Sequence, residues 1–181
     1  MLHYLQNLFQ ALDVSSLTDA VLRVAAVFLC LTVHETCHGL AALALGDPTA
    51  KSMHRLSLNP LHHIDWLGLA LMFTVGFGWA KPVPVNPNYF RKPKQGMAVT
   101  ALAGPVSNVL LALVFLFLYG LLYRALYSVQ FLLDMIWLTA YISLALAIFN
   151  IIPVSPLDGS KVLFALLPDA CLLYTSDAAD D

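Results

Sequence analysis

The residues best suited to chemistry are His34, Glu35 and His38, which lie within an almost wholly apolar stretch of the chain. Residues four apart share one face of a helix, so both imidazoles can bind one cation. Glu35 follows His34 directly and is angled toward the open side of that cation, where a carboxylate can take a proton from water. The pattern therefore predicts a hydrolytic metal centre with two histidine ligands and a glutamate general base.

The surrounding sequence places this pattern in a membrane. The chain has 181 residues, of which 60% are hydrophobic and 11% are charged, and its mean hydropathy is +0.77. Soluble domains carry about 25% charged residues. Burying histidine and glutamate in lipid costs several kcal/mol unless they are paired or metal-bound, so we expect these residues to be functional.

Composition also excludes several classes of function. The net charge of -2 and the lack of a basic cluster with interleaved aromatic residues exclude nucleic acid as a partner. Cys30, Cys37 and Cys171 are scattered without a paired spacing, so neither a disulfide framework nor a thiolate zinc site is indicated. Cys37 is expected to pack between helices, because it points about 100° away from His38.

Asp158 is the best candidate for a third metal ligand. It closes the last long apolar run and is the only carboxylate between Asp134 and Asp169. A zinc site with two histidines and one carboxylate leaves the fourth position free for water or substrate.

The apolar runs predict an all-α polytopic membrane protein with three to four membrane segments. Residues 17–45, 96–123 and 135–157 are each long enough to cross about 30 Å of hydrocarbon. Residues 64–80 are marginal for a span, and a short re-entrant or sheet-like element between the first two clear spans is a fair alternative.

Prolines predict where the chain is extended or a helix ends, and the Asn108 amide predicts a polar contact within a span. Pro82, Pro84 and Pro87 make residues 81–87 an extended strand or loop. Pro153 and Pro156 end the regular helix after Asn150. The amide of Asn108 lies in an apolar span and needs a partner, which on composition alone is equally well an interhelical hydrogen bond or a functional contact.

Basic residues predict the orientation of the chain. If residues 64–80 dip into the membrane and return, the stretch 46–95 holds six lysines and arginines on one side, against Arg124 alone on the other. The positive-inside rule then places residues 46–95 in the cytoplasm of what is expected to be a prokaryotic plasma membrane. This arrangement also returns Asp158 to the half of the membrane that holds His38.

Several further motifs occur in a fixed order with the first. They are Gly46-Asp47-Pro48-Thr49-Ala50, Asn59-Pro60-Leu61, Gly78-Trp79-Ala80-Lys81-Pro82-Val83-Pro84, Ala103-Gly104-Pro105-x-x-Asn108 and Asn150-x-x-Pro153-x-x-Pro156-Leu157-Asp158-Gly159. Together they resemble the site-2 protease family of intramembrane zinc metalloproteases, in its short prokaryotic form without a PDZ domain.

The resemblance implies roles for individual residues. Zinc would be held by His34, His38 and Asp158, with Glu35 as general base. Asn108 would help to hold substrate or to stabilise the oxyanion, and Asn150 would orient the turn that carries Asp158. The substrate would be a membrane protein with a transmembrane helix, cleaved in or near that helix within the lipid bilayer.

The sequence departs from the family pattern in two places. His54 stands before Arg55 where the family usually has glycine, so the local turn is expected to differ. The chain ends soon after the Asp158 helix, and residues 169–181 resemble read-through on a truncated gene fragment. We therefore divide the chain into an interfacial amphipathic segment (1–16), an intramembrane metalloprotease core (17–168) and a non-native-looking tail (169–181).

A second function remains open from the residues alone. A non-catalytic membrane metal-binding protein or transporter could hold a metal with the same three ligands. Glu35 discriminates between the two, because only a protease needs it as a base.

Overall fold

The computed structural model describes residues 14–63, 65–74 and 81–168, and this part of the chain contains helices and loops but no strand. Its elements in chain order are α2 (Val14–Ala44), α3 (Thr49–Ser52), the 3-10 helix η1 (Pro60–His63), α4 (Trp66–Thr74), the 3-10 helix η2 (Pro87–Tyr89), α5 (Pro93–Leu122), α6 (Gln130–Ile151) and α7 (Asp158–Leu166).

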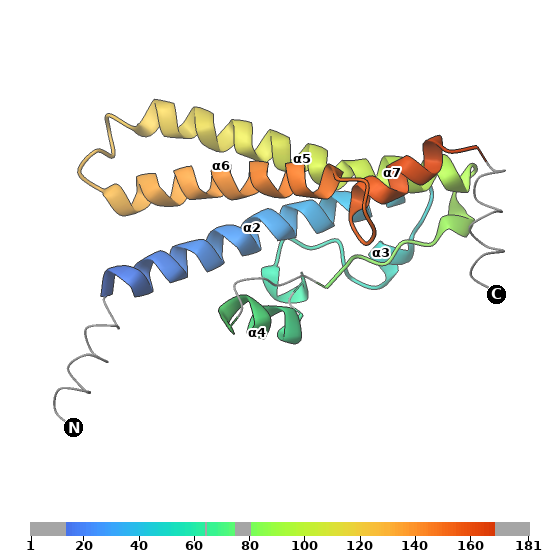
Figure 1. Cartoon of the computed structure of the whole chain (residues 1–181), viewed down its shortest axis with the longest axis horizontal. Helices are drawn as coiled ribbons and strands as arrows, with labels where there is room; N and C mark the ends of the chain where they lie inside the picture. The colour runs from blue at the N-terminus through green and yellow to red at the C-terminus, as the bar shows by residue number, and fades with distance from the viewer. Residues whose placement is uncertain (1–13, 64, 75–80, 169–181) are drawn as a thin grey trace, which may run out of the picture.

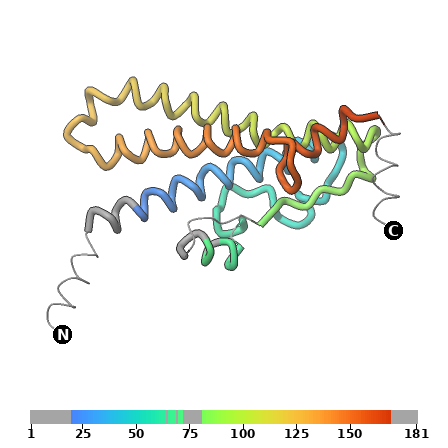
Figure 2. The backbone as a smooth tube through the Cα atoms, viewed as in Figure 1, coloured from blue at the N-terminus to red at the C-terminus, as the bar shows by residue number. Residues whose placement is uncertain are grey.

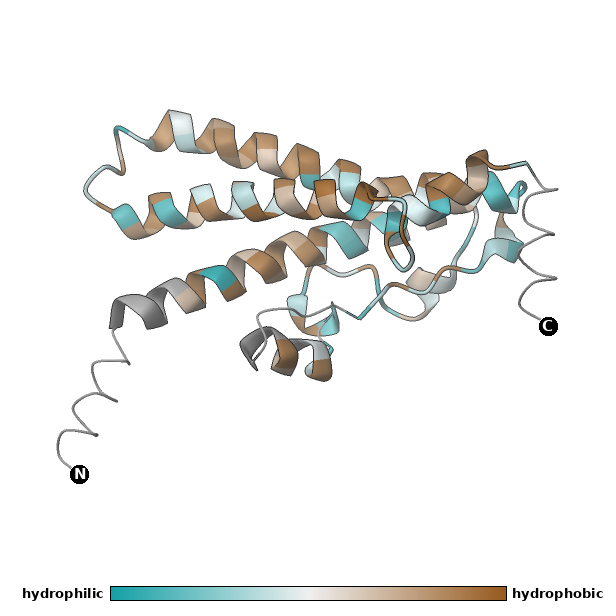
Figure 3. Ribbon diagram, viewed as in Figure 1, coloured by the Kyte–Doolittle hydropathy of each residue, from teal (hydrophilic) through white to brown (hydrophobic). Residues whose placement is uncertain are grey.

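Three long helices form the body of the protein. Ala20–Ala44 of α2, together with α5 and α6, are long and apolar enough to cross a membrane. They run side by side, with α5 packed against α2, α6 and the short α7 (Figure 1). Hydrophobic residues make up most of their length (Figure 3), and large apolar side chains such as Phe117, which is 70% exposed, face outward. This confirms the all-helical membrane protein predicted from composition.

Small side chains line the contacts between the three helices. Ala26 and Cys30 of α2, Ala112 of α5 and Ala140 of α6 are all buried. Lipid tails are as apolar as leucine, so helices in a membrane gain most from close backbone approach and interhelical polar contacts. The Cys30 thiol accordingly lies 3.5 Å from the carbonyl oxygen of Thr139. These small residues allow close backbone approach, and among the described residues the larger Leu22 and Leu133 are buried as well.

The ends of the helices differ modestly from the predictions. α2 begins at Val14, so residues 14–16 belong to this helix, and the rest of the predicted interfacial segment lies outside the described residues. α6 begins at Gln130, which places Asp134 inside the helix, and it ends at Ile151, at the break predicted from Pro153 and Pro156. The predicted tail, 169–181, also lies outside the described residues.

The prediction of a sheet-like element within residues 64–80 is not supported. Residues 66–74 form α4, while residues 75–80 lie outside the described part of the chain. A helix of 9 residues is about 14 Å long, far short of the bilayer. α2 ends and α5 begins at the same end of the bundle (Figure 2), so the connecting segment returns to the side from which it started. The physical reason is that an apolar segment without a paired edge satisfies its backbone most simply as a helix.

An extended strap, residues 81–86, crosses the face of α2 on its way to α5. Arg55 holds one end, because its guanidinium donates to the carbonyl oxygens of His62, at 2.6 Å, and Lys81, at 2.7 Å. Asp47 holds the other end, because its Oδ2 accepts the Asn86 N–H at 2.7 Å. Pro82 and Pro84 explain why this segment is extended, as predicted, while Pro87 begins η2.

His54 occupies the turn that leads to Arg55 with a left-handed backbone, at φ 53°. This region favours glycine, since a side chain there meets its own backbone. The histidine that stands where the family usually has glycine therefore has a strained backbone conformation. Glycine would fit this position better than the histidine does.

We expect His54→Gly to stabilise the protein. Relief of the left-handed strain gains about 1–2 kcal/mol, and the extra freedom of glycine in the unfolded chain offsets about 0.5–1 kcal/mol. Thermal unfolding in detergent should show a higher midpoint. The matched control is Lys51→Gly within α3, which should lower the midpoint; a lower midpoint for both variants would contradict the assignment.

The Asp47 anchor predicts a pH dependence of stability. Burial raises the pKa of Asp47, but hydrogen bonds from the Thr49 hydroxyl and from the N–H groups of Asn86 and Thr49 lower it, and the net pKa lies below its ordinary value. A lowered folded pKa contributes stability above the unfolded pKa of about 3.9 and loses it as pH falls through the folded pKa. Wild type should therefore exceed Asp47→Asn by about 1 kcal/mol near neutral pH.

The difference between these two proteins should shrink as pH falls below about 4, as measured by denaturant unfolding at several pH values. A difference that grows toward acid pH would show that Asp47 is not an ionised anchor.

Candidate metal centre

Three polar side chains converge where α2, α5 and α7 meet. The Nε2 atoms of His34 and His38 lie 3.0 Å apart, and Oδ2 of Asp158 lies 3.1 Å from each. His34 is 3% exposed, His38 8% and Asp158 7%. The structure therefore brings together the three predicted ligands, from positions 124 and 120 residues apart in the sequence.

These three atoms suit a zinc ion. Two imidazole nitrogens and one carboxylate oxygen form a common catalytic zinc donor set, with bonds of about 2 Å and a fourth position left open. One ion can reach all three atoms at their observed separations, and these residues form a candidate metal site among the described histidines, cysteines and acids. Cys37 is half-buried and does not belong to this cluster, in line with its predicted packing role.

The ring of His38 is oriented by the backbone of α5. Its Nδ1 lies 2.7 Å from the carbonyl oxygen of Thr100, which can only accept a hydrogen bond. Nδ1 must therefore carry the proton, and Nε2 keeps its lone pair for a metal. Thr100 was not singled out from the sequence, because a backbone carbonyl has no residue signature.

Gly104 brings α5 close to both imidazoles. A Cβ atom at this position would lie 2.5 Å from Nε2 of His38 and 2.6 Å from Cε1 of His34. The sequence shows Gly104 as part of a motif with Pro105 and Asn108 but does not reveal that it faces the histidines. Its spacing, one turn after Thr100 and one before Asn108, is the signal that could have placed it at the centre.

The first turn of α7 presents Asp158 to the histidines. Gly159 allows this approach, because a Cβ there would overlap the carbonyl oxygen of Ile151. Lys161, three residues along the helix, places Nζ 3.1 Å from Oδ1 of Asp158. One carboxylate oxygen thus faces the histidines while the other faces a lysine that sequence reasoning missed.

Glu35 differs from the ligands in its surroundings. It is half-buried, and its Oε2 accepts the N–H of Val83 in the strap at 2.9 Å. The strap lies close to α2 at Gly39, where a Cβ would come within 3.2 Å of Val83 Cγ1. The strap therefore fixes the carboxylate beside the ligand cluster and away from the bundle core.

Asn108 and Asn150 occupy separate places near the ligands. Asn108 is fully buried, and its Nδ2 lies 3.2 Å from Nδ1 of His34. The Asn150 amide donates to the carbonyl oxygen of Leu146 within α6. Asn150 also lines a mainly apolar pocket of about 190 Å³ between α5, the end of α6 and α7, which Asp158 borders. The predicted roles of both asparagines stay predictions.

His63 lies in η1, in the segment that precedes the strap. His63 is 3% exposed and places Nε2 2.8 Å from the carbonyl oxygen of Ser57. Its backbone carbonyl accepts the Lys81 N–H. The residues around His63 therefore help to fix the start of the strap.

We expect Gly104→Ala to disrupt the metal centre, since its methyl group would overlap both imidazoles. Purified protein should hold at least 10-fold less zinc at limiting metal, as expected for a disturbed ligand environment. Gly120→Ala is the matched control on the same helix, because a Cβ there meets nothing within 4 Å. Equal zinc content in both variants would contradict this close packing.

Comparisons with known proteins agree with the geometry. The sequence model of Peptidase family M50 matches residues 124–171. Two relatives carry the name "Putative zinc metalloprotease". YwhC of Bacillus subtilis (strain 168) is 40% identical over 154 residues, which cover 80% of this chain and 68% of that protein. Rip2 of Mycolicibacterium smegmatis is 26% identical over 148 residues, covering 79% of this chain and 56% of that protein.

No solved structure matches the chain. The identity and coverage of YwhC, the M50 match and the membrane-spanning helices together identify the chain. It belongs to peptidase family M50, the site-2 protease family, and is a zinc metalloprotease of the membrane.

Proposed function

We propose that this protein is an intramembrane endopeptidase that cleaves membrane-protein substrates in or near a transmembrane helix. His34, His38 and Asp158 hold the zinc, and Glu35 acts as general base. The observation that carries the proposal is the convergence of these three buried ligand atoms within 3.1 Å of one another, beside a half-buried glutamate.

Zinc held by His34, His38 and Asp158 would supply a Lewis acid for the peptide carbonyl and would make a bound water acidic enough to lose a proton near neutral pH. Glu35 accepts that proton at its carboxylate and returns it to the leaving amine. The Val83 N–H holds Oε2 of Glu35 in place, so the base does not have to be ordered during the reaction. The buried ligands exclude bulk water from the rest of the site.

The substrate must present an extended backbone to this site. A transmembrane helix hides its amides in internal hydrogen bonds, so the segment to be cleaved has to unwind before hydrolysis. The strap is already extended and lies beside Glu35, where a substrate strand can pair with it. The neighbouring apolar pocket suits an apolar side chain of that strand, as a membrane segment would supply.

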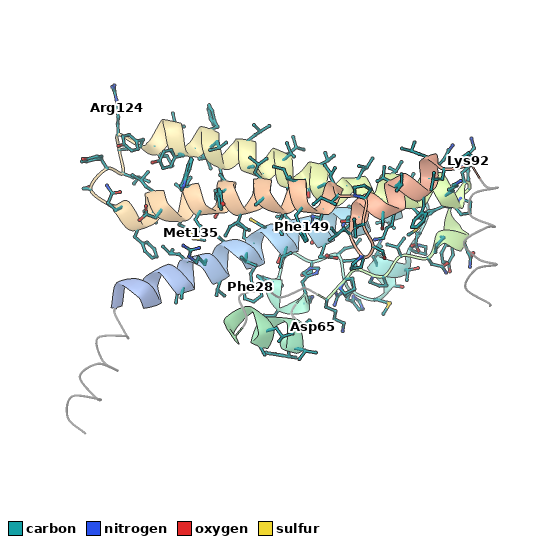
Figure 4. The ribbon with its side chains drawn as sticks, viewed as in Figure 1. Phe28, Asp65, Lys92, Arg124, Met135 and Phe149 are labelled. Carbon is teal, nitrogen blue, oxygen red and sulfur yellow. The ribbon has the colours of Figure 1, made fainter. Side chains whose placement is uncertain are left out.

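The orientation of the chain follows from its charges. Lys92 and Arg124 lie at opposite ends of the bundle (Figure 4), and six of the nine lysines and arginines of the chain, Lys92 among them, belong to residues 46–95. The positive-inside rule places the Lys92 end, with residues 46–95, in the cytoplasm of a prokaryotic cell membrane. His38 lies six residues before the end of α2, about 9 Å from that end, so water has a short path to the site.

Glu35→Gln should separate metal binding from catalysis. The variant keeps all three ligands and should retain stoichiometric zinc, while loss of the base lowers the cleavage rate by about 10²–10⁴. The assay is hydrolysis of a single-span membrane substrate in detergent, with zinc measured on the same samples.

His34→Ala is the companion variant, and it should lose both zinc and cleavage. If wild type and Glu35→Gln both bind zinc and cleave the substrate at the same rate, the assignment of Glu35 as general base is wrong. Stoichiometric zinc with no cleavage by wild type would instead favour a non-catalytic metal-binding protein.

A further inference from the structure

We propose that Asn108 is a positioning residue: its side-chain oxygen accepts the Nδ1 proton of His34 and so directs the Nε2 lone pair to the metal. This inference rests on the proposed metal site. It assigns Asn108 a role different from the oxyanion contact expected from sequence.

The contacts of Asn108 are confined to its neighbours in the bundle. Its side chain is fully buried, and its amide nitrogen lies 3.2 Å from Nδ1 of His34. Its Oδ1 has no hydrogen-bond partner within the described residues. The backbone at this position is held by Ser143, whose hydroxyl donates to the Asn108 carbonyl oxygen at 2.9 Å.

The two nitrogens of His34 face different groups. Nε2 faces His38 and Asp158, so it must carry a lone pair if the cluster is to hold a metal. A neutral imidazole then carries its proton on Nδ1, and this proton needs an acceptor. An amide nitrogen can only donate, whereas the amide oxygen can only accept.

In the metal-holding state the amide nitrogen of Asn108 and the protonated Nδ1 of His34 are two donors facing each other, and a half-turn of the amide removes this mismatch. The oxygen and nitrogen of the amide are nearly the same size, so the turn exchanges them without other movement. The oxygen then accepts the Nδ1–H of His34 and is no longer unpaired. The unflipped amide would set its N–H against the Nδ1–H of His34, whereas the flipped amide sets an acceptor there, so the metal-holding state favours the flipped orientation.

The Thr100 carbonyl gives His38 the same kind of acceptor that the Asn108 oxygen gives His34. The Thr100 carbonyl already accepts from Nδ1 of His38, and Asn108 lies two turns further along the same face of α5. One helix thus provides an acceptor for each histidine, with Gly104 between them. Neither acceptor replaces a metal ligand.

The position of Asn108 argues against direct contact with a developing oxyanion. Its amide faces Nδ1 of His34, and the ligand cluster lies on the Nε2 side. The imidazole ring therefore separates the amide from the reacting atoms. A donor to the oxyanion would need to reach the open side of the metal instead.

The test is zinc affinity, measured by competition with a chelator on the whole chain in detergent. Asn108→Leu keeps the size of the side chain but removes the acceptor, and it should weaken zinc binding about 10–100-fold. Asn108→Asp keeps an acceptor oxygen and should restore affinity to within about threefold of wild type. Thr139→Val is the control for loss of a buried polar group, since the Thr139 hydroxyl donates to Met135 within α6.

The oxyanion role gives the opposite pattern. Both Asn108 variants would then bind zinc like wild type and lose about 10²–10³ in kcat, because neither leucine nor aspartate can donate. That result would overturn the proposal. Zinc binding that is lost in Asn108→Leu and restored in Asn108→Asp would support it.

A second measurement does not depend on the folding of a variant. Nitrogen NMR of ¹⁵N-histidine in the zinc-loaded wild type should show both ligand histidines, His34 and His38, protonated at Nδ1 and metal-bound at Nε2. Binding through Nδ1 would overturn the proposal. Zinc bound through Nε2 without peptide cleavage would overturn the peptidase but leave this assignment of Asn108 standing.

Discussion

The fold depends on the meeting of Asp158 with His34 and His38 inside a lipid-facing bundle. Polar groups in hydrocarbon are costly unless they find partners, and each of these residues would be unfavourable alone. Their convergence requires α6 to end at Ile151 and the chain to return, so that α7 begins at Asp158. Gly159 lets the start of α7 lie against the end of α6. The break after α6 is therefore part of the metal centre.

α5 packs directly against the two histidines of this candidate centre. Thr100, Gly104 and Asn108 recur every four residues and so share one face, which lies against the two histidines. The Thr100 carbonyl orients the ring of His38, and the Asn108 amide faces the ring of His34. Gly104 has no side chain and so leaves room for both rings. The same helix has an open position at Gly120, where a Cβ atom would meet nothing within 4 Å. Close packing on α5 thus includes the part that faces the ligands and does not extend to Gly120.

The sequence predicted the ligands better than their surroundings. His34, His38 and Asp158 carry signals of type and spacing, and the cost of burying them in lipid makes those signals strong. The three spans followed from hydropathy. Thr100 acts through its backbone and leaves no such signal, while the contact of Lys161 becomes meaningful only once Asp158 faces the histidines. The short α4 was ambiguous because a brief apolar run suits helix and strand alike.

The proposed mechanism requires that water be kept from the metal ligands but reach the general base, Glu35. The structure meets both needs by placing them on neighbouring positions of one helix. His34 is buried against α5, whereas Glu35 is half-buried and faces the strap. The polar residues Arg55 and Asp47 hold the strap at its two ends, outside the spanning helices. A change in the strap therefore acts on the base first and on the ligands only through α2, so the two functions of the motif are separable by mutation.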